Sequence, residues 1–79
     1  MISTRPKEKY IMKISEAIFD EIELKILCNL SQGINLRKTA KELNISESQI
    51  YKITKNIKKK LKTRNMTHAV YRAIKYKFI

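Results

Sequence analysis

The chain has no tryptophan among its 79 residues, and it has only one cysteine, one histidine, one proline and one glycine. The single thiol, Cys28, excludes an internal disulfide, and together with His68 it cannot supply the four ligands of a structural zinc site. The sequence also has no glycine-rich phosphate loop and no paired carboxylates beyond those expected at a helix start. We therefore expect neither an enzyme nor a metal or cofactor site.

Long hydrophobic runs are missing as well. No apolar run approaches the ~20 residues that cross a membrane, and no apolar stretch with a small-residue cleavage site follows the N-terminus. A chain of 79 residues has room for one domain, near the lower limit for a self-sufficient hydrophobic core. We expect a cytoplasmic protein.

Acidic residues are scarce where basic residues are dense. Residues 46–79 hold ten Lys or Arg against Glu47 alone, a net charge of +9, whereas residues 19–45 are neutral and residues 1–18 carry +2. A general bias towards lysine would not leave the middle of the chain neutral. Clustered cations bind polyanions because binding releases condensed counterions. The gradient predicts double-stranded DNA as partner rather than its main competitor, an anionic membrane surface.

The N-terminal part of the chain contains an arm and a helix start. Residues 1–18 are polar and basic, and we expect them to form a partly flexible arm. Two interpretations are open: the arm contacts DNA phosphates or a partner subunit, or it is a disordered leader. Asp20 is placed to cap a helix, with Glu23 completing a capping box. Gly33, the one glycine, suits the left-handed residue that ends this helix.

Two further helices follow with a tight turn between them. Asn35 is placed to cap a helix over Leu36–Leu43, and Asn44-Ile45 makes the turn. Ser46-Glu47-Ser48-Gln49 is a second capping box, which starts a helix over Glu47–Leu61. This arrangement is the plan of a helix-turn-helix DNA-binding protein, in which the second helix of the pair enters the major groove.

The helix expected over 47–61 has two unlike faces. Ile50, Ile53, Ile57 and Leu61 recur at steps of three and four, which predicts a core-facing stripe. The opposite face is polar and cationic, as suits the base edges and phosphates of the major groove. A solvated surface helix would also be polar, but it usually mixes charges of both signs. The predicted DNA-binding residues are Ser48, Gln49, Tyr51, Lys52, Lys55, Asn56, Lys58 and Lys59, with Arg37 and Lys38 from the preceding helix. If Lys59 or Lys60 meets phosphate, its change to alanine should weaken binding to all sequences alike.

A fourth helix is expected over 66–77, with Asn65 as its cap. Its apolar stripe is larger than one small core is expected to cover, and exposed apolar surface favours self-association. The predicted dimerisation residues are Ala69, Val70, Tyr71, Ala73 and Ile74, and Tyr76, Phe78 and Ile79 add further apolar surface.

Residues 19–79 resemble the LuxR/GerE-type (NarL-type) helix-turn-helix domain of bacterial transcription factors. The matching positions are Glu23, Ile26-Leu27, Gly33, Ala40-x-x-Leu43-x-Ile45-Ser46, Gln49-Ile50, Ile57-x-x-Lys60-Leu61, Asn65 and Ala69-Val70-x-x-Ala73. Three positions depart from the family pattern: Tyr51 replaces a usual lysine, Ile53 a usual histidine and Met66 a usual arginine.

The resemblance implies an all-α, four-helix (tetrahelical) domain over residues 19–79. In the family, the third helix reads DNA and the fourth pairs two subunits on a two-fold site. Tyr51, Lys52 and Lys55 fall at positions that commonly meet base edges in the family. The short chain resembles the stand-alone, GerE-like members, whose activity would follow from their abundance rather than from phosphorylation or an autoinducer.

Three functions are compatible with these patterns. The first is a homodimeric, sequence-specific DNA-binding transcription regulator. The second is an interaction protein of the same fold, either an antagonist that heterodimerises with a larger regulator or a factor that binds RNA polymerase. Tyr51 and Ile53 support this second hypothesis, because the family usually has basic or polar residues there. The third is a region of a sigma factor, against which the Ala69-Val70-x-x-Ala73 pattern argues.

Overall fold

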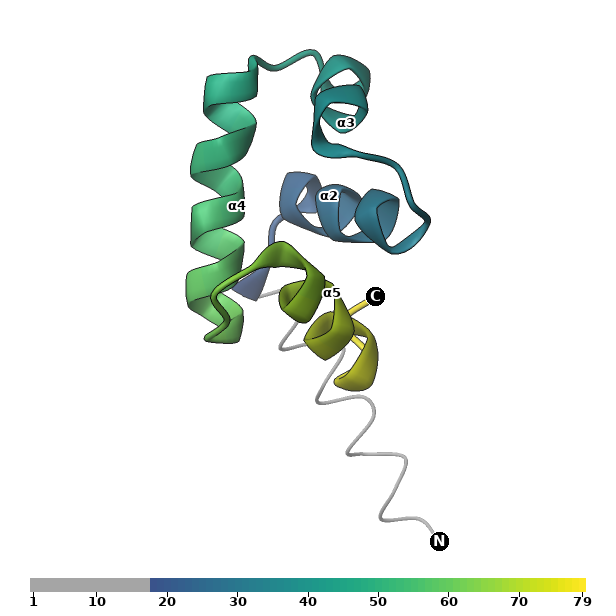
Figure 1. The fold of residues 1–79 in the computed structure, drawn as a ribbon, viewed down its shortest axis with the longest axis vertical. Coiled ribbons are helices and arrows are strands. Elements are labelled where there is room, and N and C mark those ends of the chain that lie inside the picture. The colour runs from purple at the N-terminus through teal and green to yellow at the C-terminus, as the bar shows by residue number, and fades with distance from the viewer. Residues whose placement is uncertain (1–17) are drawn as a thin grey trace, which may run out of the picture.

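The structure, a computed structural model, describes residues 18–79, which form four α-helices joined by short turns. The helices are α2 (Glu21–Ser31), α3 (Leu36–Leu43), α4 (Glu47–Leu61) and α5 (Met66–Lys75). The longest helix, α4, runs along one edge of the molecule, and the other three helices lie on one side of it (Figure 1). The all-α, four-helix fold expected from the sequence is confirmed. The predicted N-terminal arm lies outside the described residues, apart from Ile18.

The four described helices begin at the N-caps that the sequence predicts. In each case the cap side chain accepts a hydrogen bond from the backbone N–H three residues later, which satisfies one of the free donors of the first turn. Both predicted capping boxes are present, at the starts of α2 and α4. The N-cap residues are Asp20, Asn35, Ser46 and Asn65.

The same four helices end in a common way, with a left-handed residue just after the last turn. These residues are Gly33, Asn44, Lys62 and Lys77. The residue after each of them donates its N–H back to a carbonyl in the last turn, as Ile45 does to Ala40 at 3.0 Å. At the end of α5 this closure stops the helix at Lys75, two residues before the predicted end at Lys77.

One small hydrophobic core lies between the four helices. It contains Phe19, Ile26, Leu27, Ala40, Ile50, Ile57, Leu61, Ala69 and Ala73. The turn after α5 brings Phe78 back against Phe19, with the ring centroids 5.3 Å apart in an edge-to-face arrangement. Phe78 is half-buried and packs on the core, so the expectation that it adds free apolar surface is wrong.

The core-facing stripe of α4 differs from the prediction at one position. Thr54 is buried in place of Ile53, which is half-buried at the side of the helix and packs against the core cluster. The Thr54 hydroxyl donates to the Tyr51 carbonyl at 2.8 Å, so its burial leaves no unsatisfied donor. Thr54 can therefore lie in the core, although the periodicity of apolar residues predicts Ile53 there.

A buried polar network connects α2 to α3. The Asn29 side-chain amide donates to Thr39 Oγ1 at 3.2 Å and to Glu42 Oε1 at 3.0 Å. The Thr39 hydroxyl in turn donates to the Asn35 carbonyl at 2.9 Å. Because Asn29 and Thr39 are both buried, these hydrogen bonds fix the crossing of the two helices more strictly than apolar contacts alone would.

Candidate nucleic-acid interface

The outer face of α4 forms a straight row of polar and cationic side chains. Ser48, Lys52, Lys55 and Lys59 recur at steps of four, three and four, and all four are exposed. At 1.5 Å per residue the row is about 16 Å long. None of the other helices in the described residues covers this face (Figure 1). A B-DNA major groove, about 12 Å wide, accepts a helix of this kind.

Tyr51 and Asn56 lie on either side of that row. Both are exposed, and the Tyr51 side chain is 54% exposed although it is aromatic. Its ring offers an apolar surface with a hydroxyl at the tip, and the Asn56 amide offers both a donor and an acceptor. Together with the lysines these groups match the donor and acceptor patterns of base edges.

Two predicted contact residues on α4 have other neighbours. Gln49 Oε1 accepts from the Ser46 backbone N–H at 2.9 Å, so one side of this amide is held in the helix cap and only the NH₂ group remains for a ligand. Lys58 is half-buried, whereas Lys55 and Lys59 are exposed. The row described above is therefore the better candidate for direct contacts.

α3 adds two cations near the start of α4. Arg37 and Lys38 are both exposed in the first turn of α3. Arg37 Nε lies 3.5 Å from Glu47 Oε2, and their side chains are 74% and 55% exposed. An ion pair this exposed contributes little to stability, so a phosphate can displace the carboxylate from Arg37.

Lys60 is held by the protein and does not lie free on the outer face. Its Nζ donates to Glu23 Oε1 at 2.7 Å and also to the Ile18 carbonyl. The Glu23 side chain is only 3% exposed, and the same oxygen accepts the Asp20 backbone N–H at 3.0 Å. Lys60 is therefore already paired: this lysine neutralises a buried carboxylate and fixes the last turn of α4 on the start of α2.

The same end of α4 is also fixed by α5. Arg72 Nη1 donates to the Leu61 carbonyl at 2.8 Å and to the Lys62 carbonyl at 3.3 Å. These carbonyls lie where α4 ends and have no partner within the helix. Sequence patterns do not reveal this role, because an arginine on a helix is usually a solvated residue.

The predicted dimerisation residues divide into two groups. Ala69 and Ala73 are fully buried in the core of their own chain, so the expectation that they meet a partner is wrong. Val70 is half-buried and lines a small hollow with Leu30, Met66 and Thr67. Tyr71 and Ile74 are 58% and 52% exposed.

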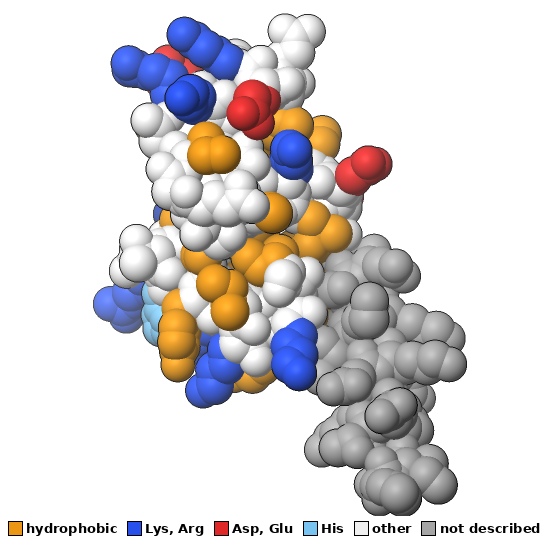
Figure 2. All heavy atoms as spheres, turned by 90° about the vertical axis from the view of Figure 1, so that its right-hand side faces the viewer, with side chains coloured by type: hydrophobic (Ala, Val, Ile, Leu, Met, Phe, Trp, Pro, Cys, Tyr) orange, Lys and Arg blue, Asp and Glu red, His pale blue; other side chains and the backbone are white. Residues whose placement is uncertain are grey.

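Figure 2 shows the face of the molecule opposite α4, where hydrophobic side chains cross the middle and Lys and Arg lie above and below. On α5 itself, Lys75 Nζ lies 5.9 Å from the Tyr71 ring centroid and 6.0 Å from that of Tyr76. An apolar surface bordered by cations in this way is available to a protein partner.

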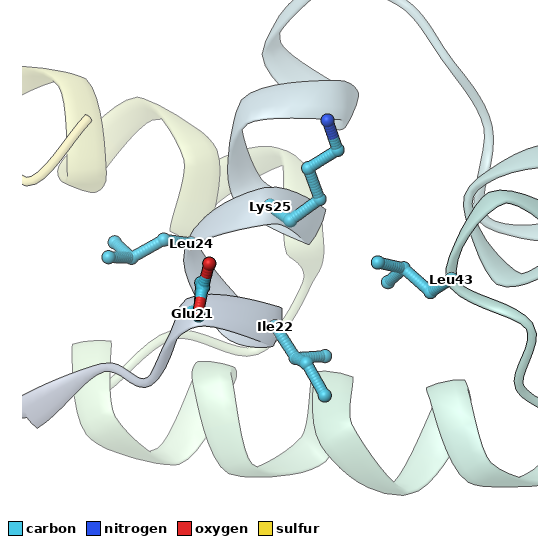
Figure 3. Close-up of a pocket in the computed structure, with 5 residues that line it drawn as sticks. All are labelled: Glu21, Ile22, Leu24, Lys25 and Leu43. Atoms are coloured by element: carbon cyan, nitrogen blue, oxygen red, sulfur yellow. The ribbon is translucent and has the colours of Figure 1, made fainter.

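A second hollow lies between α2 and α3. Its volume is about 500 Å³, and it is lined by Glu21, Ile22, Leu24, Lys25 and Leu43. In Figure 3 the Leu43 side chain points across the hollow towards α2, while Leu24 points to the far side of that helix. Ile22, an apolar residue of this lining, is 40% exposed.

Residues 18–79 contain no group of three or more His, Cys, Asp or Glu side chains placed to hold a metal ion. No helix within these residues is long and apolar enough to span a membrane. The most developed surface is the cationic face of α4 together with the first turn of α3.

Comparison with known proteins agrees with this geometry. The family of bacterial regulatory proteins called the luxR family (GerE) matches residues 20–73. The match begins at the N-cap of α2 and ends within α5, so it covers all of α2, α3 and α4. No curated protein and no solved structure matches the chain significantly.

Proposed function

The chain belongs to the luxR family of bacterial regulatory proteins, and from this premise we propose that it is a sequence-specific, dimeric transcription regulator that inserts α4 into the major groove of DNA. The observation that carries the proposal is the row Ser48, Lys52, Lys55 and Lys59. It combines hydrogen-bond donors for bases with cations for phosphates, and it is free of acidic residues.

Each part of this face has its own task. Tyr51 and Lys52 lie in the first half of α4 and Lys55 lies at its middle, on the outer face that would meet base edges in the groove. A lysine donates to guanine O6 and N7, and the aromatic ring of Tyr51 packs against a thymine methyl group. Lys59 and the α3 cations Arg37 and Lys38 bind phosphates on either side and set the position of the helix.

We further propose that two copies pair through the exposed side of α5. The surface includes Tyr71 and Ile74, with Val70 at its edge. A two-fold pair presents two copies of α4 to half-sites about one helical turn apart, near 34 Å. DNA regulation of this kind places the protein in the cytoplasm.

An interaction protein of the same fold is the alternative function, with RNA polymerase or a larger regulator as partner. The hollow lined by Ile22 and Leu43 favours it, because this apolar surface lies apart from the outer face of α4. The position of Ile53 weakens it. This side chain packs on the core, so its difference from the family pattern removes no group from the outer face.

Binding to a random pool of DNA duplexes, followed by sequencing of the retained fraction, tests the proposal. We expect enrichment of a two-fold symmetric site, with an affinity that falls steeply as salt rises. The spacing of the half-sites reports the geometry of the dimer.

The matched control for this experiment is a variant with Lys52→Gln and Lys55→Gln, which keeps the fold but removes both central cations. It should recover no enriched site. If the unmodified chain binds no duplex at low salt, or binds with no salt dependence, the regulator proposal fails and a pull-down from lysate addresses the alternative.

A further inference from the structure

Tyr51 is an aromatic side chain on an otherwise polar and cationic surface. Its neighbours along the outer face of α4 are Ser48, three residues before it, and Lys55, four residues after it, and both are exposed. More than half of Tyr51 is exposed as well. The ring therefore belongs to the surface that α4 presents to DNA.

The ring of Tyr51 is free of contacts that would hold it elsewhere. The other aromatic side chains in residues 18–79 each lie near a second ring. Within the same residues Tyr51 has no ring or cation partner, and its hydroxyl makes no hydrogen bond. Glu47, the one acidic residue of α4, is four residues before Tyr51, and its carboxylate lies 3.5 Å from Arg37 Nε on α3. The aromatic ring is therefore available to a ligand.

The major groove of DNA offers one apolar group to such a ring. Base edges there present hydrogen-bond donors and acceptors, and thymine alone of the four bases adds a C5-methyl group. The ammonium group of a lysine gains little from this methyl group, whereas an aromatic ring removes it from water. In 5-methylcytosine a methyl group stands on the same ring carbon. An apolar contact at this position would therefore also distinguish a methylated cytosine from an unmethylated one.

We propose that Tyr51 reads the C5-methyl group of a pyrimidine in the major groove, in 5-methylcytosine as well as in thymine, so that methylation of cytosine strengthens binding at that base pair. The inference rests on the proposed DNA-binding function and deepens it, because the modification state of the DNA becomes part of the recognised site. The lysines beside Tyr51 supply no such preference, since they bind hydrogen-bond acceptors and phosphates.

Two pairs of duplexes that differ by one methyl group test this inference on the full chain. The thymines of the site selected from a random pool are replaced one at a time by uracil, and the most sensitive position is then occupied by cytosine or by 5-methylcytosine. We expect thymine to bind about fourfold more tightly than uracil, as the burial of one methyl group implies. The 5-methylcytosine duplex should exceed the cytosine duplex by a similar ratio.

Three variants assign the preference to the ring. Tyr51→Ala removes the ring at an exposed helix position, where alanine is the most favourable residue, and should bring both ratios close to one. Tyr51→Phe removes only the hydroxyl and should keep both ratios. Lys59→Ala is the matched control, because it should lower the affinity for all four duplexes without changing either ratio.

The outcomes separate this inference from the function on which it rests. If the unmodified chain binds the selected site and no methyl group changes its affinity, the inference is overturned while the regulator function stands. Ratios that persist in Tyr51→Ala or disappear in Tyr51→Phe also overturn it, because another group or the hydroxyl is then responsible. A ratio close to one for the cytosine pair alone overturns the recognition of 5-methylcytosine. If the unmodified chain binds no duplex, the proposed function fails and this inference fails with it.

Discussion

Lys60 Nζ lies 2.7 Å from Glu23 Oε1, and this contact joins the last turn of α4 to the N-cap of α2 across 37 positions of sequence. The carboxylate is buried, whereas a third of the lysine side chain remains exposed. The buried Glu23 carboxylate therefore needs its partner more than Lys60 does, because the lysine can be solvated by water.

The first prediction uses this inequality. Lys60→Met should lower the free energy of unfolding by about 2–3 kcal/mol, because it leaves the Glu23 charge buried without its partner. Glu23→Gln should cost only about 1 kcal/mol, because Lys60 can turn to water and the glutamine carbonyl still accepts the Asp20 N–H. Urea unfolding followed by circular dichroism measures both. Equal losses for the two variants would contradict the account.

A second prediction concerns the network between α2 and α3. Thr39→Val keeps the shape of a fully buried side chain but removes the hydroxyl that accepts from Asn29 and donates to Asn35. We expect a loss of about 1–2 kcal/mol. Thr67→Val on the exposed side of α5 is the control and should change stability by less than about 0.5 kcal/mol. A thermal unfolding comparison that finds no difference between them would show that the network contributes nothing.

The third prediction tests the helix end at Gly33. Its φ is +85°, and a Cβ added there would meet no atom within 4 Å. The cost of Gly33→Ala is therefore the left-handed backbone itself, about 1–2 kcal/mol. Gly33→Asn should cost less, because asparagine tolerates this conformation. The order Gly, Asn, Ala in melting temperature is expected, and an alanine variant as stable as the parent would refute it.

The fourth prediction separates base contacts from phosphate contacts on α4. Lys55→Ala should weaken binding to the selected site by about 1–3 kcal/mol and relax preference at one base pair. Lys59→Ala should weaken all duplexes alike and reduce the salt slope by about 1. Fluorescence anisotropy with the selected site and a scrambled duplex distinguishes them. If both variants lose affinity equally for both duplexes, the division of tasks along the helix is wrong.

The fifth prediction addresses self-association. Ile74→Glu places a charge on the exposed side of α5 and should raise the dimer dissociation constant at least tenfold without changing the stability of the monomer. Ala73→Leu should instead overpack the core of the monomer. It should lower the free energy of unfolding by about 1–3 kcal/mol. Sedimentation velocity and urea unfolding measure the two effects. A dimer unaffected by Ile74→Glu would exclude this surface.

The starts of the helices could be predicted from the sequence because they depend on hydrogen bonds between residues close together in the chain. An N-cap such as Asn35 bonds a backbone group three residues away, so its partner is known without the tertiary structure. The helix ends at Gly33 and Asn44 can also be predicted from the sequence, because glycine and asparagine are the residues that most readily adopt the left-handed conformation. Lys62 and Lys77 adopt the same conformation without being glycine or asparagine, so the residue type does not predict these two helix ends.

The candidate site was predicted less completely, because periodicity shows which residues share a face but not what covers that face. Ala69 and Ala73 form a stripe on α5, and their own chain buries it. Lys60 belongs to a basic helix, and its partner Glu23 is 37 residues away, so the sequence alone does not reveal the ion pair. The outer row of α4 can be predicted without the tertiary structure, because steps of three and four residues place side chains on the same face of any α-helix.

The hydrogen bonds from Arg72 to the carbonyls of Leu61 and Lys62 have a thermodynamic consequence. They join the end of α4 to α5, so we expect a change in the tilt of one helix to move the other. If DNA holds α4 and a second copy holds α5, the two equilibria are linked. By reciprocity, DNA would then strengthen dimerisation by the same factor by which dimerisation strengthens DNA binding.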